Sequence, residues 1–151
     1  ACSRYGADHK VGQSVYSTSY SPRSLKEGNM NQTNVFGESI EECCSHPITG
    51  YFRDGFCNTT KYDQGSHTIC ALITEEFLVF SQSRGNDLST PKPEFEFPGL
   101  VAGQSWCLCA GRWLEAHEAG VAPRVHLKRT NSQSLNVVPL DILRHYATDL
   151  N

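Results

Sequence analysis

The sequence predicts an α+β fold, in which a small mixed or antiparallel sheet packs against roughly two or three helices with long ordered loops between them. Three observations lead to this class. Strand-like segments mix with helical segments, no regular βαβ rhythm orders them, and stretches rich in glycine, proline and polar residues separate them. The sequence contains neither an internal repeat nor a phosphate-binding glycine loop.

The composition is that of an ordinary globular protein. The chain has 151 residues, of which 38% are hydrophobic and 19% are charged, and this length suits one domain with its own core. The net charge of −3 argues against general nucleic-acid binding, which usually requires a basic surface. No apolar run approaches the ~18 residues of a membrane-spanning helix. We therefore expect neither nucleic acid nor a membrane as a partner, and the sequence does not indicate an oligomeric state.

The first 33 residues differ in composition from the rest. They are rich in serine and carry four basic and two acidic side chains, whereas residues 34–151 have an excess of acidic side chains. We expect residues 1–33 to form either a disordered extension or a transit-like leader, and residues 34–151 to form a single globular domain. Because no secretion signal is apparent, we expect an intracellular, cytoplasmic protein, with organelle targeting as the alternative.

Local signals define the first strand and helix of the domain. Residues 66–73 read as a strand, and Thr74 directly after them is a good helix N-cap. The two glutamates that follow suit the positive end of a helix. Gly85 is placed to end this helix at its C′ position. We therefore predict a helix from about 75 to 84.

The second half of the chain is predicted from similar signals. Residues 105–110 read as a strand and residues 111–119 as a helix that ends at Gly120. Residues 124–129 and 135–138 read as two further strands, and Pro139 suits the first position of a last helix. The proline-rich stretch from 86 to 103 reads as a fixed loop that includes a short edge strand.

Cysteine is the residue type that most strongly suggests chemistry. Seven cysteines form an odd number, and without a secretion signal we expect most of them to be thiols in a reducing compartment. Two of them lie two residues apart on a predicted strand, so both point to the same face, with Cα atoms roughly 6.6 Å apart. This distance is at the upper limit for a disulfide between them. These two are Cys107 and Cys109.

Three roles are open for the cysteines: structural thiols, a reactive thiol, or ligands of a metal. Zinc, the metal that such a set would suit best, takes about four nitrogen or sulfur ligands. No paired CxxC motif, the usual sequence signature of such a site, occurs. The predicted zinc ligands are Cys44, Cys70, Cys107 and Cys109.

Cys57 is the candidate for a catalytic thiol. It lies in a polar loop four residues after Arg53, and a guanidinium nearby favours the thiolate. His67 is the candidate base, since a cysteine and a histidine can meet in space without being close in sequence. The alternative is that Arg53 pairs with Asp54 or braces the backbone of the loop.

Two polar segments are candidates for binding an anionic or amide-bearing small molecule. The alternative for the second segment is a helix C-cap followed by a turn, in which Asp87 accepts hydrogen bonds from the backbone near Ser89. The candidate binding residues are Arg53, Asp54 and Asn58 in the first segment and Arg84, Asn86 and Asp87 in the second.

Several distinctive blocks occur along the chain in this order: Cys44-Ser45, Thr49-Gly50, Arg53-Asp54-Gly55, Cys57-Asn58-Thr59, His67 to Ala71, Glu76-Phe77-Leu78, Gly85 to Pro91, Phe97 to Leu100 and Trp106 to Ala110. Together they resemble the family of proteins that contain the domain of unknown function numbered 2237. The resemblance runs from about 34 to 147. It implies a compact α+β domain and supplies no activity, cofactor or catalytic residue.

The resemblance also sorts the cysteines. Cys2 and Cys43 fall outside the family-like positions, whereas the other five fall on them, and this makes Cys2 and Cys43 poor site candidates. The chain departs from the family pattern at Thr60 and Glu96, where the resemblance implies glycine. The turns at these two positions are therefore expected to differ.

Two hypotheses about function follow. The first is a thiol-based or metal-dependent enzyme or redox protein, whose cysteine sulfurs converge at a pocket open to solvent. The second is a non-catalytic binding or regulatory module, whose motif-dense loops fold into a rigid recognition surface without a pocket. Its cysteines are expected to be structural, buried and distant from one another. Neither hypothesis identifies a substrate.

Overall fold

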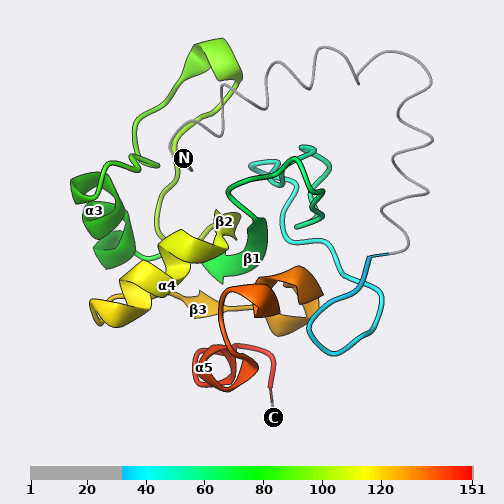
Figure 1. The fold of residues 1–151 in the computed structure, drawn as a ribbon. Helices are drawn as coiled ribbons and strands as arrows, with labels where there is room; N and C mark the ends of the chain where they lie inside the picture. Colours follow the sequence, from blue (N-terminus) through cyan, green and yellow to red (C-terminus); the bar gives the residue numbers. More distant parts are fainter. Residues whose placement is uncertain (1–31, 151) are drawn as a thin grey trace, which may run out of the picture.

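A three-stranded antiparallel sheet lies at the centre of the computed structural model, which describes residues 32–150 (Figure 1). Its strands are β1 (His67–Leu72), β2 (Ser105–Cys109) and β3 (Arg124–Val125), in the order β2-β1-β3. Three α-helices accompany the sheet in the described part of the chain, and the predicted α+β class is therefore confirmed. The predicted extension, residues 1–33, lies almost entirely outside the described residues.

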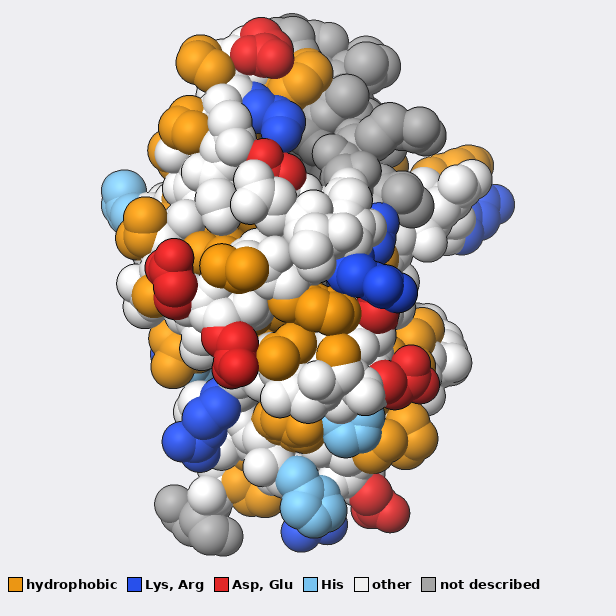
Figure 2. Space-filling view, turned by 90° about the vertical axis from the view of Figure 1, so that its left-hand side faces the viewer, with side chains coloured by type: hydrophobic (Ala, Val, Ile, Leu, Met, Phe, Trp, Pro, Cys, Tyr) orange, Lys and Arg blue, Asp and Glu red, His pale blue; other side chains and the backbone are white. Residues whose placement is uncertain are grey.

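The α-helices are α3 (Glu75–Ser83), α4 (Ala110–Glu118) and α5 (Leu140–Arg144). Helix α4 packs against β1 and β2, and α3 packs against α4. In Figure 1 these two helices lie on one side of the sheet, and the segment from 32 to 66, drawn in blue to green, lies on the other. On the α3 side, hydrophobic side chains lie in small groups between acidic and basic ones (Figure 2).

Helix α3 begins and ends where the local signals predict. The Thr74 hydroxyl accepts a hydrogen bond from the backbone N–H of Phe77 at 3.1 Å, so one of the four unpaired N–H groups of the first turn is satisfied. Gly85 follows the C-cap residue with φ of +89°, a conformation that glycine adopts without strain. The predicted N-cap and helix end are both confirmed.

Replacing Thr74 with alanine is expected to lower the free energy of unfolding by about 1 kcal/mol, because the N–H of Phe77 loses its partner. Urea denaturation followed by circular dichroism measures this loss. Ser83→Ala is the matched control, since the exposed Ser83 hydroxyl only donates to the carbonyl of Phe80 at the other end of the helix. Equal losses in the two variants would contradict a capping role for Thr74.

Two predicted strands are wrong in extent or type. The strand predicted over 124–129 ends after Val125, and Leu127–Arg129 form a 3₁₀-helix, because the chain turns away from the sheet once His126 N–H donates to the carbonyl of Cys70 at 2.9 Å. Residues 135 and 136 of the strand predicted over 135–138 belong instead to a 3₁₀-helix, Ser132–Asn136, and the other two form a turn. The Asn131 side chain caps this helix at the N–H of Gln133, a local signal that overrides the β-branched residues that follow.

Two hydrophobic clusters fill the interior of the part of the chain that the structure describes. The larger one joins the sheet to the helices around Trp113, which is fully buried and donates from its indole N–H to the carbonyl of Pro123 at 3.0 Å. The smaller one lies where the loop from 32 to 66 covers the sheet, and it contains Ile40 and Phe56 packed against cysteines. This smaller cluster positions the site described next.

Candidate functional site

Four cysteines, which we call the cysteine cluster, meet between the sheet and the loop that covers it. Cys70 on β1 and Cys107 on β2 are direct cross-strand partners. The loop supplies the other two, so that Cys43 bonds to Cys70 and Cys57 bonds to Cys107, with Cα–Cα distances of 5.8 and 5.3 Å. The Sγ atoms of Cys43, Cys57 and Cys70 all lie within 4.8 Å of one another.

The expectation that the cysteines are mostly thiols is wrong for this cluster. All four are disulfide-bonded and at most 4% exposed. Cys109 is disulfide-bonded as well, whereas Cys44 has a free thiol of intermediate exposure. The expectation failed because it rested on the absence of a secretion signal, which says nothing about which cysteines meet in space.

The predicted catalytic pair is not assembled as a thiol and a base. Cys57 is fully buried and bonded to Cys107, so it has no thiol to ionise. His67 is 5% exposed, and its ring nitrogen Nδ1 is bound to Asp63. The roles of Cys57 as nucleophile and His67 as base stay a prediction. Cys57 could act as a nucleophile only after the Cys57–Cys107 disulfide is reduced.

The predicted zinc set is only half brought together. Cys70 and Cys107 lie in the cluster, but their neighbours there are Cys43 and Cys57 rather than Cys44 and Cys109. The resemblance makes Cys43 a poor site candidate because it lies outside the family-like blocks, yet the structure makes it a member of the cysteine cluster. Cys43 and Cys44 are adjacent in sequence, so no local signal tells them apart.

The loop Gly50–Asn58 holds the first predicted binding segment in a tight conformation. A side chain at Gly50 would collide with the carbonyl of Phe56. Arg53 is buried at 8% exposure with φ of +55°, and its guanidinium donates to the carbonyl of Phe95 at 3.3 Å. Arg53 therefore braces the backbone, as the alternative interpretation proposed.

Asp54 and Asn58 lie together in this loop. The Asn58 amide donates to Asp54 at 3.2 Å, and the N–H of Phe56 donates to the same carboxyl group at 3.0 Å. Burial raises the pKa of Asp54 above its ordinary value, and these two hydrogen bonds only partly offset that effect. The structure thus brings together Arg53, Asp54 and Asn58 as a loop-stabilising group.

The second predicted binding segment has partners of its own. Arg84 pairs with Glu115 at 2.8 Å, and this pairing lowers the pKa of the Glu115 carboxyl. Asp87 accepts from Ser89 N–H, Thr90 N–H and the Thr90 hydroxyl, a turn that was the predicted alternative to binding. Asn86 is 1% exposed, with its backbone bonded to the side chain and carbonyl of a serine on α3. A binding role for these three residues stays a prediction.

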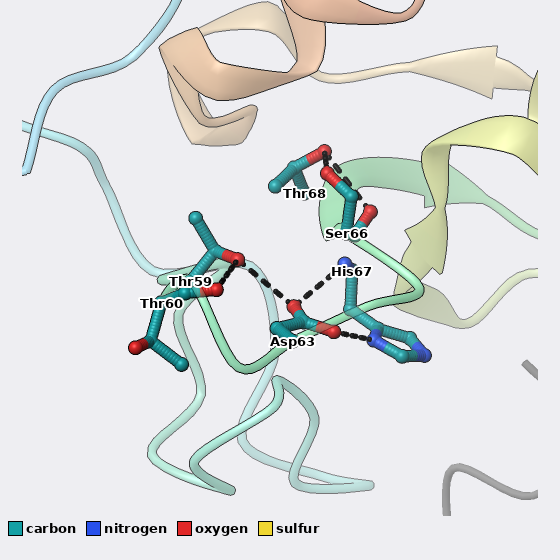
Figure 3. Close-up of polar contacts among 6 residues, drawn as sticks. All are labelled: Thr59, Thr60, Asp63, Ser66, His67 and Thr68. Carbon is teal, nitrogen blue, oxygen red and sulfur yellow. Dashed lines mark hydrogen bonds and ion pairs between the residues drawn. The ribbon is translucent and has the colours of Figure 1, made fainter.

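A buried polar network lies at the start of β1 (Figure 3). The Asp63 carboxylate accepts from His67 Nδ1 at 2.6 Å, from His67 N–H at 2.9 Å and from the Thr59 hydroxyl at 2.9 Å. Burial by itself raises the pKa of Asp63, but these hydrogen bonds and the nearby imidazole outweigh it and hold the pKa below its ordinary value. Asp63 is therefore ionised at neutral pH and orients His67.

A cleft of about 610 Å³, which we call the polar cleft, lies beside this network. Three distant segments form it, and hydrogen bonds join them: Asn131 donates to Gln32 at 2.7 Å and to the carbonyl of Cys57 at 3.0 Å. The lining residues are Gln32, Thr33, Thr59, Thr60, Lys61, Asp63, Ser66, Asn131, Ser132, Gln133, Asn136 and Val137. None of these residues is a site candidate from the sequence, because only folding brings the three segments together.

Fold and site together define a small α+β domain whose covering loop is fixed to its sheet by disulfides and which carries a polar cleft beside a buried Asp–His pair. The chain belongs to the family described as uncharacterized protein conserved in bacteria (DUF2237), whose model matches residues 33–147. The suspected family is thus confirmed. No curated protein matches the chain. Among residues 32–150, no helix is long and apolar enough to span a membrane.

Proposed function

We propose that this domain is a non-catalytic binding module, whose cysteines are structural and whose polar cleft takes a small uncharged compound rich in hydroxyl or amide groups. The observation that carries the proposal is that the cleft wall is hydrogen-bonded to the disulfide-held loop. Asn131, which lines the cleft, donates to the carbonyl of Cys57 at 3.0 Å, and Cys57 is bonded to Cys107 on β2.

The chemistry of the lining determines the class of ligand. Five lining residues carry a hydroxyl and four carry an amide, against one lysine, one aspartate and one valine. The aspartate, Asp63, already accepts hydrogen bonds from His67 and Thr59 within the protein. Hydroxyl and amide side chains each offer both donors and acceptors, which suits polyols, sugars and amides better than ions.

The rigidity of the cleft also supports binding. Gln32 exchanges hydrogen bonds with both backbone groups of Thr59, at 3.0 and 3.1 Å, and Thr33 bonds to the Ser132 hydroxyl at 3.0 Å. These bonds cross between segments that lie 27 and 99 residues apart in sequence. A wall fixed in this way loses little conformational entropy when a ligand binds, so modest contacts give useful affinity.

Nuclear magnetic resonance titration of the isotope-labelled domain with a panel of monosaccharides, linear polyols and primary amides tests this proposal. We expect at least one compound to shift the amide resonances of Thr60, Ser66 and Gln133 in the cleft. Thr60→Val keeps the shape of the side chain and removes its hydroxyl. It is expected to weaken binding of that compound by about 3–10-fold, the effect of one hydrogen bond.

Ser83→Ala is the control, since it removes a hydroxyl from the exposed surface of α3. Its affinity for the compound should equal that of the unaltered protein. Failure of every compound to bind, or resonance shifts confined to residues outside the cleft, would overturn the proposed function.

A further inference from the structure

We propose that the cysteine cluster binds one Zn²⁺ ion through Cys43, Cys57, Cys70 and Cys107 when its two disulfides are reduced. The cluster would then cross-link the loop to the sheet in both redox states, by disulfides when oxidised and by metal when reduced. This proposal does not depend on the polar cleft or its ligand.

The geometry already brings three of the four sulfurs together, and the fourth is bonded to one of these three. Tetrahedral zinc with Zn–S bonds of ~2.3 Å places its sulfur ligands ~3.8 Å apart. Three of the sulfurs lie within 4.8 Å of one another, and the fourth, on Cys107, is bonded to Cys57. Reduction lets each bonded pair separate, and movement of the Cys107 sulfur toward the other three then completes four ligands around one centre.

The arrangement is two ligands from the sheet and two from the loop. Cys70 and Cys107 face each other across β1 and β2, so their side chains lie on the same face of the sheet. Cys43 and Cys57 approach that face from the loop, and Cys43 is held close to Cys57 because its N–H donates to the carbonyl of Gly55 at 2.7 Å. Ligands from separate, rigid segments give a closed structural site.

The backbone positions of these cysteines do not depend on the disulfides alone. Cys70 N–H donates to the Thr130 hydroxyl at 3.1 Å, and Cys107 N–H donates to the Thr49 hydroxyl at 2.9 Å. Thr49 and Thr130 are both fully buried. These contacts remain after reduction and hold the sheet cysteines and their neighbours in place for metal.

The surroundings favour metal over free thiolates. The cluster packs against Ile40 and Phe56, and its four cysteines are at most 4% exposed. A thiolate in such an apolar site is costly, and one Zn²⁺ offsets two of the four negative charges while it fixes the sulfurs. The charge of a divalent cation therefore makes ionisation of the buried thiols favourable.

The chemistry balances with a dithiol reductant. Two equivalents of the dithiol transfer four electrons and four protons to the two disulfides, giving four cysteine thiols and two equivalents of oxidised reductant. Binding of one Zn²⁺ then releases the four thiol protons and forms four Zn–S bonds. Reoxidation by a disulfide compound reverses the sequence and expels the metal.

Zinc titration of the full chain, first oxidised and then reduced by a dithiol in metal-free buffer without oxygen, tests the proposal. We expect one tightly bound Zn²⁺ per reduced chain by mass spectrometry under native conditions and none per oxidised chain. X-ray absorption of the zinc-loaded protein should show four sulfur ligands at ~2.3 Å. No bound zinc after reduction, or fewer than four sulfur ligands, would overturn the proposal.

Variants identify which sulfurs bind. Cys43→Ser is expected to weaken zinc binding at least about 100-fold, because a site that needs four ligands loses one. Cys44→Ser is the matched control, adjacent in sequence but outside the cluster, and should leave affinity unchanged, as should Cys109→Ser. Weaker zinc binding in Cys44→Ser or Cys109→Ser with unchanged binding in Cys43→Ser would overturn the assignment. If Cys43→Ser fails to fold, the number of sulfur ligands from X-ray absorption of the unaltered chain still tests the site.

Discussion

Replacing both Cys57 and Cys107 with alanine is expected to lower the free energy of unfolding by about 4 kcal/mol under oxidising conditions. The disulfide between them spans 50 residues, and the loss in chain entropy of the unfolded state grows with the size of the closed loop. Both cysteines are at most 1% exposed, so the lost sulfurs also leave a small void in the smaller cluster. For a domain of this size, such a loss is a large part of the total stability.

The other disulfide of the cysteine cluster closes a shorter loop and is therefore expected to contribute slightly less to stability. The Cys43–Cys70 disulfide spans 27 residues. From the chain entropy of the unfolded state, replacing both Cys43 and Cys70 with alanine is expected to lower the free energy of unfolding by about 3.6 kcal/mol. Urea denaturation with a metal chelator present, followed by tryptophan fluorescence, measures both double variants. Cys44→Ala is the control and should change stability by less than ~0.5 kcal/mol, since this thiol is free. If the control loses as much as the double variants, the disulfide assignment is wrong.

The elements that the sequence predicts well are those with local signals at their ends. Thr74 and Gly85 define the ends of α3, and Gly120 follows α4 with φ of +80°. Each of these signals acts within one turn of the element that it delimits, so it can be recognised without knowledge of the fold. The strand predicted at 124–129 failed because hydrogen bonds to Cys70 and Asp149, both distant in sequence, decide its conformation. The strand predicted at 135–138 failed because the cap at Asn131 starts a 3₁₀-helix there.

The site was less predictable because its residues meet only through tertiary structure. Cys43 and Cys44 have the same local sequence context, yet one is 4% exposed and disulfide-bonded and the other has a free thiol. Cross-strand pairing of Cys70 with Cys107 depends on the register of two strands that are far apart in sequence. The pairing of cysteines therefore cannot be deduced from their spacing alone.

The cysteine cluster and the polar cleft are parts of one arrangement. The loop that carries Cys57 continues directly into Thr59 and Asp63, which form the buried network beside the cleft. Asn131, which lines the polar cleft, donates a hydrogen bond to the carbonyl of Cys57. Loss of the Cys57–Cys107 cross-link is therefore expected to loosen the cleft as well as to destabilise the fold, which makes the redox state of the cluster relevant to binding.

Asp63→Asn is expected to lower the free energy of unfolding by about 2–3 kcal/mol at pH 7, because hydrogen bonds to a buried charged group are worth more than those to a neutral one. Asp63 is 6% exposed and accepts from three donors on His67 and Thr59. An asparagine keeps the shape but replaces one accepting oxygen with a donor, so at least one of these bonds is lost. Urea denaturation of the two proteins at a series of pH values measures the difference.

The pH dependence separates this effect from a loss of packing. The pKa of Asp63 is lower in the folded protein than its ordinary value of 3.8, so its contribution to stability is complete above that value and disappears as pH falls through the folded pKa. The difference in the free energy of unfolding between the unaltered protein and Asp63→Asn should therefore disappear below about pH 4. A difference in the free energy of unfolding that stays constant with pH would show that the charge of Asp63 contributes nothing to stability.

Asp54→Asn provides a control of opposite sign in the same loop. Burial raises the pKa of Asp54 in the folded protein, so the ionised group costs stability that appears as pH rises from 3.8 through the folded pKa. Asp54→Asn removes this cost and is expected to gain stability relative to the unaltered protein as pH rises over that range. Two aspartates nine residues apart thus make opposite predictions, and the same trend in both variants would mean that their burial and hydrogen bonding have been misassigned.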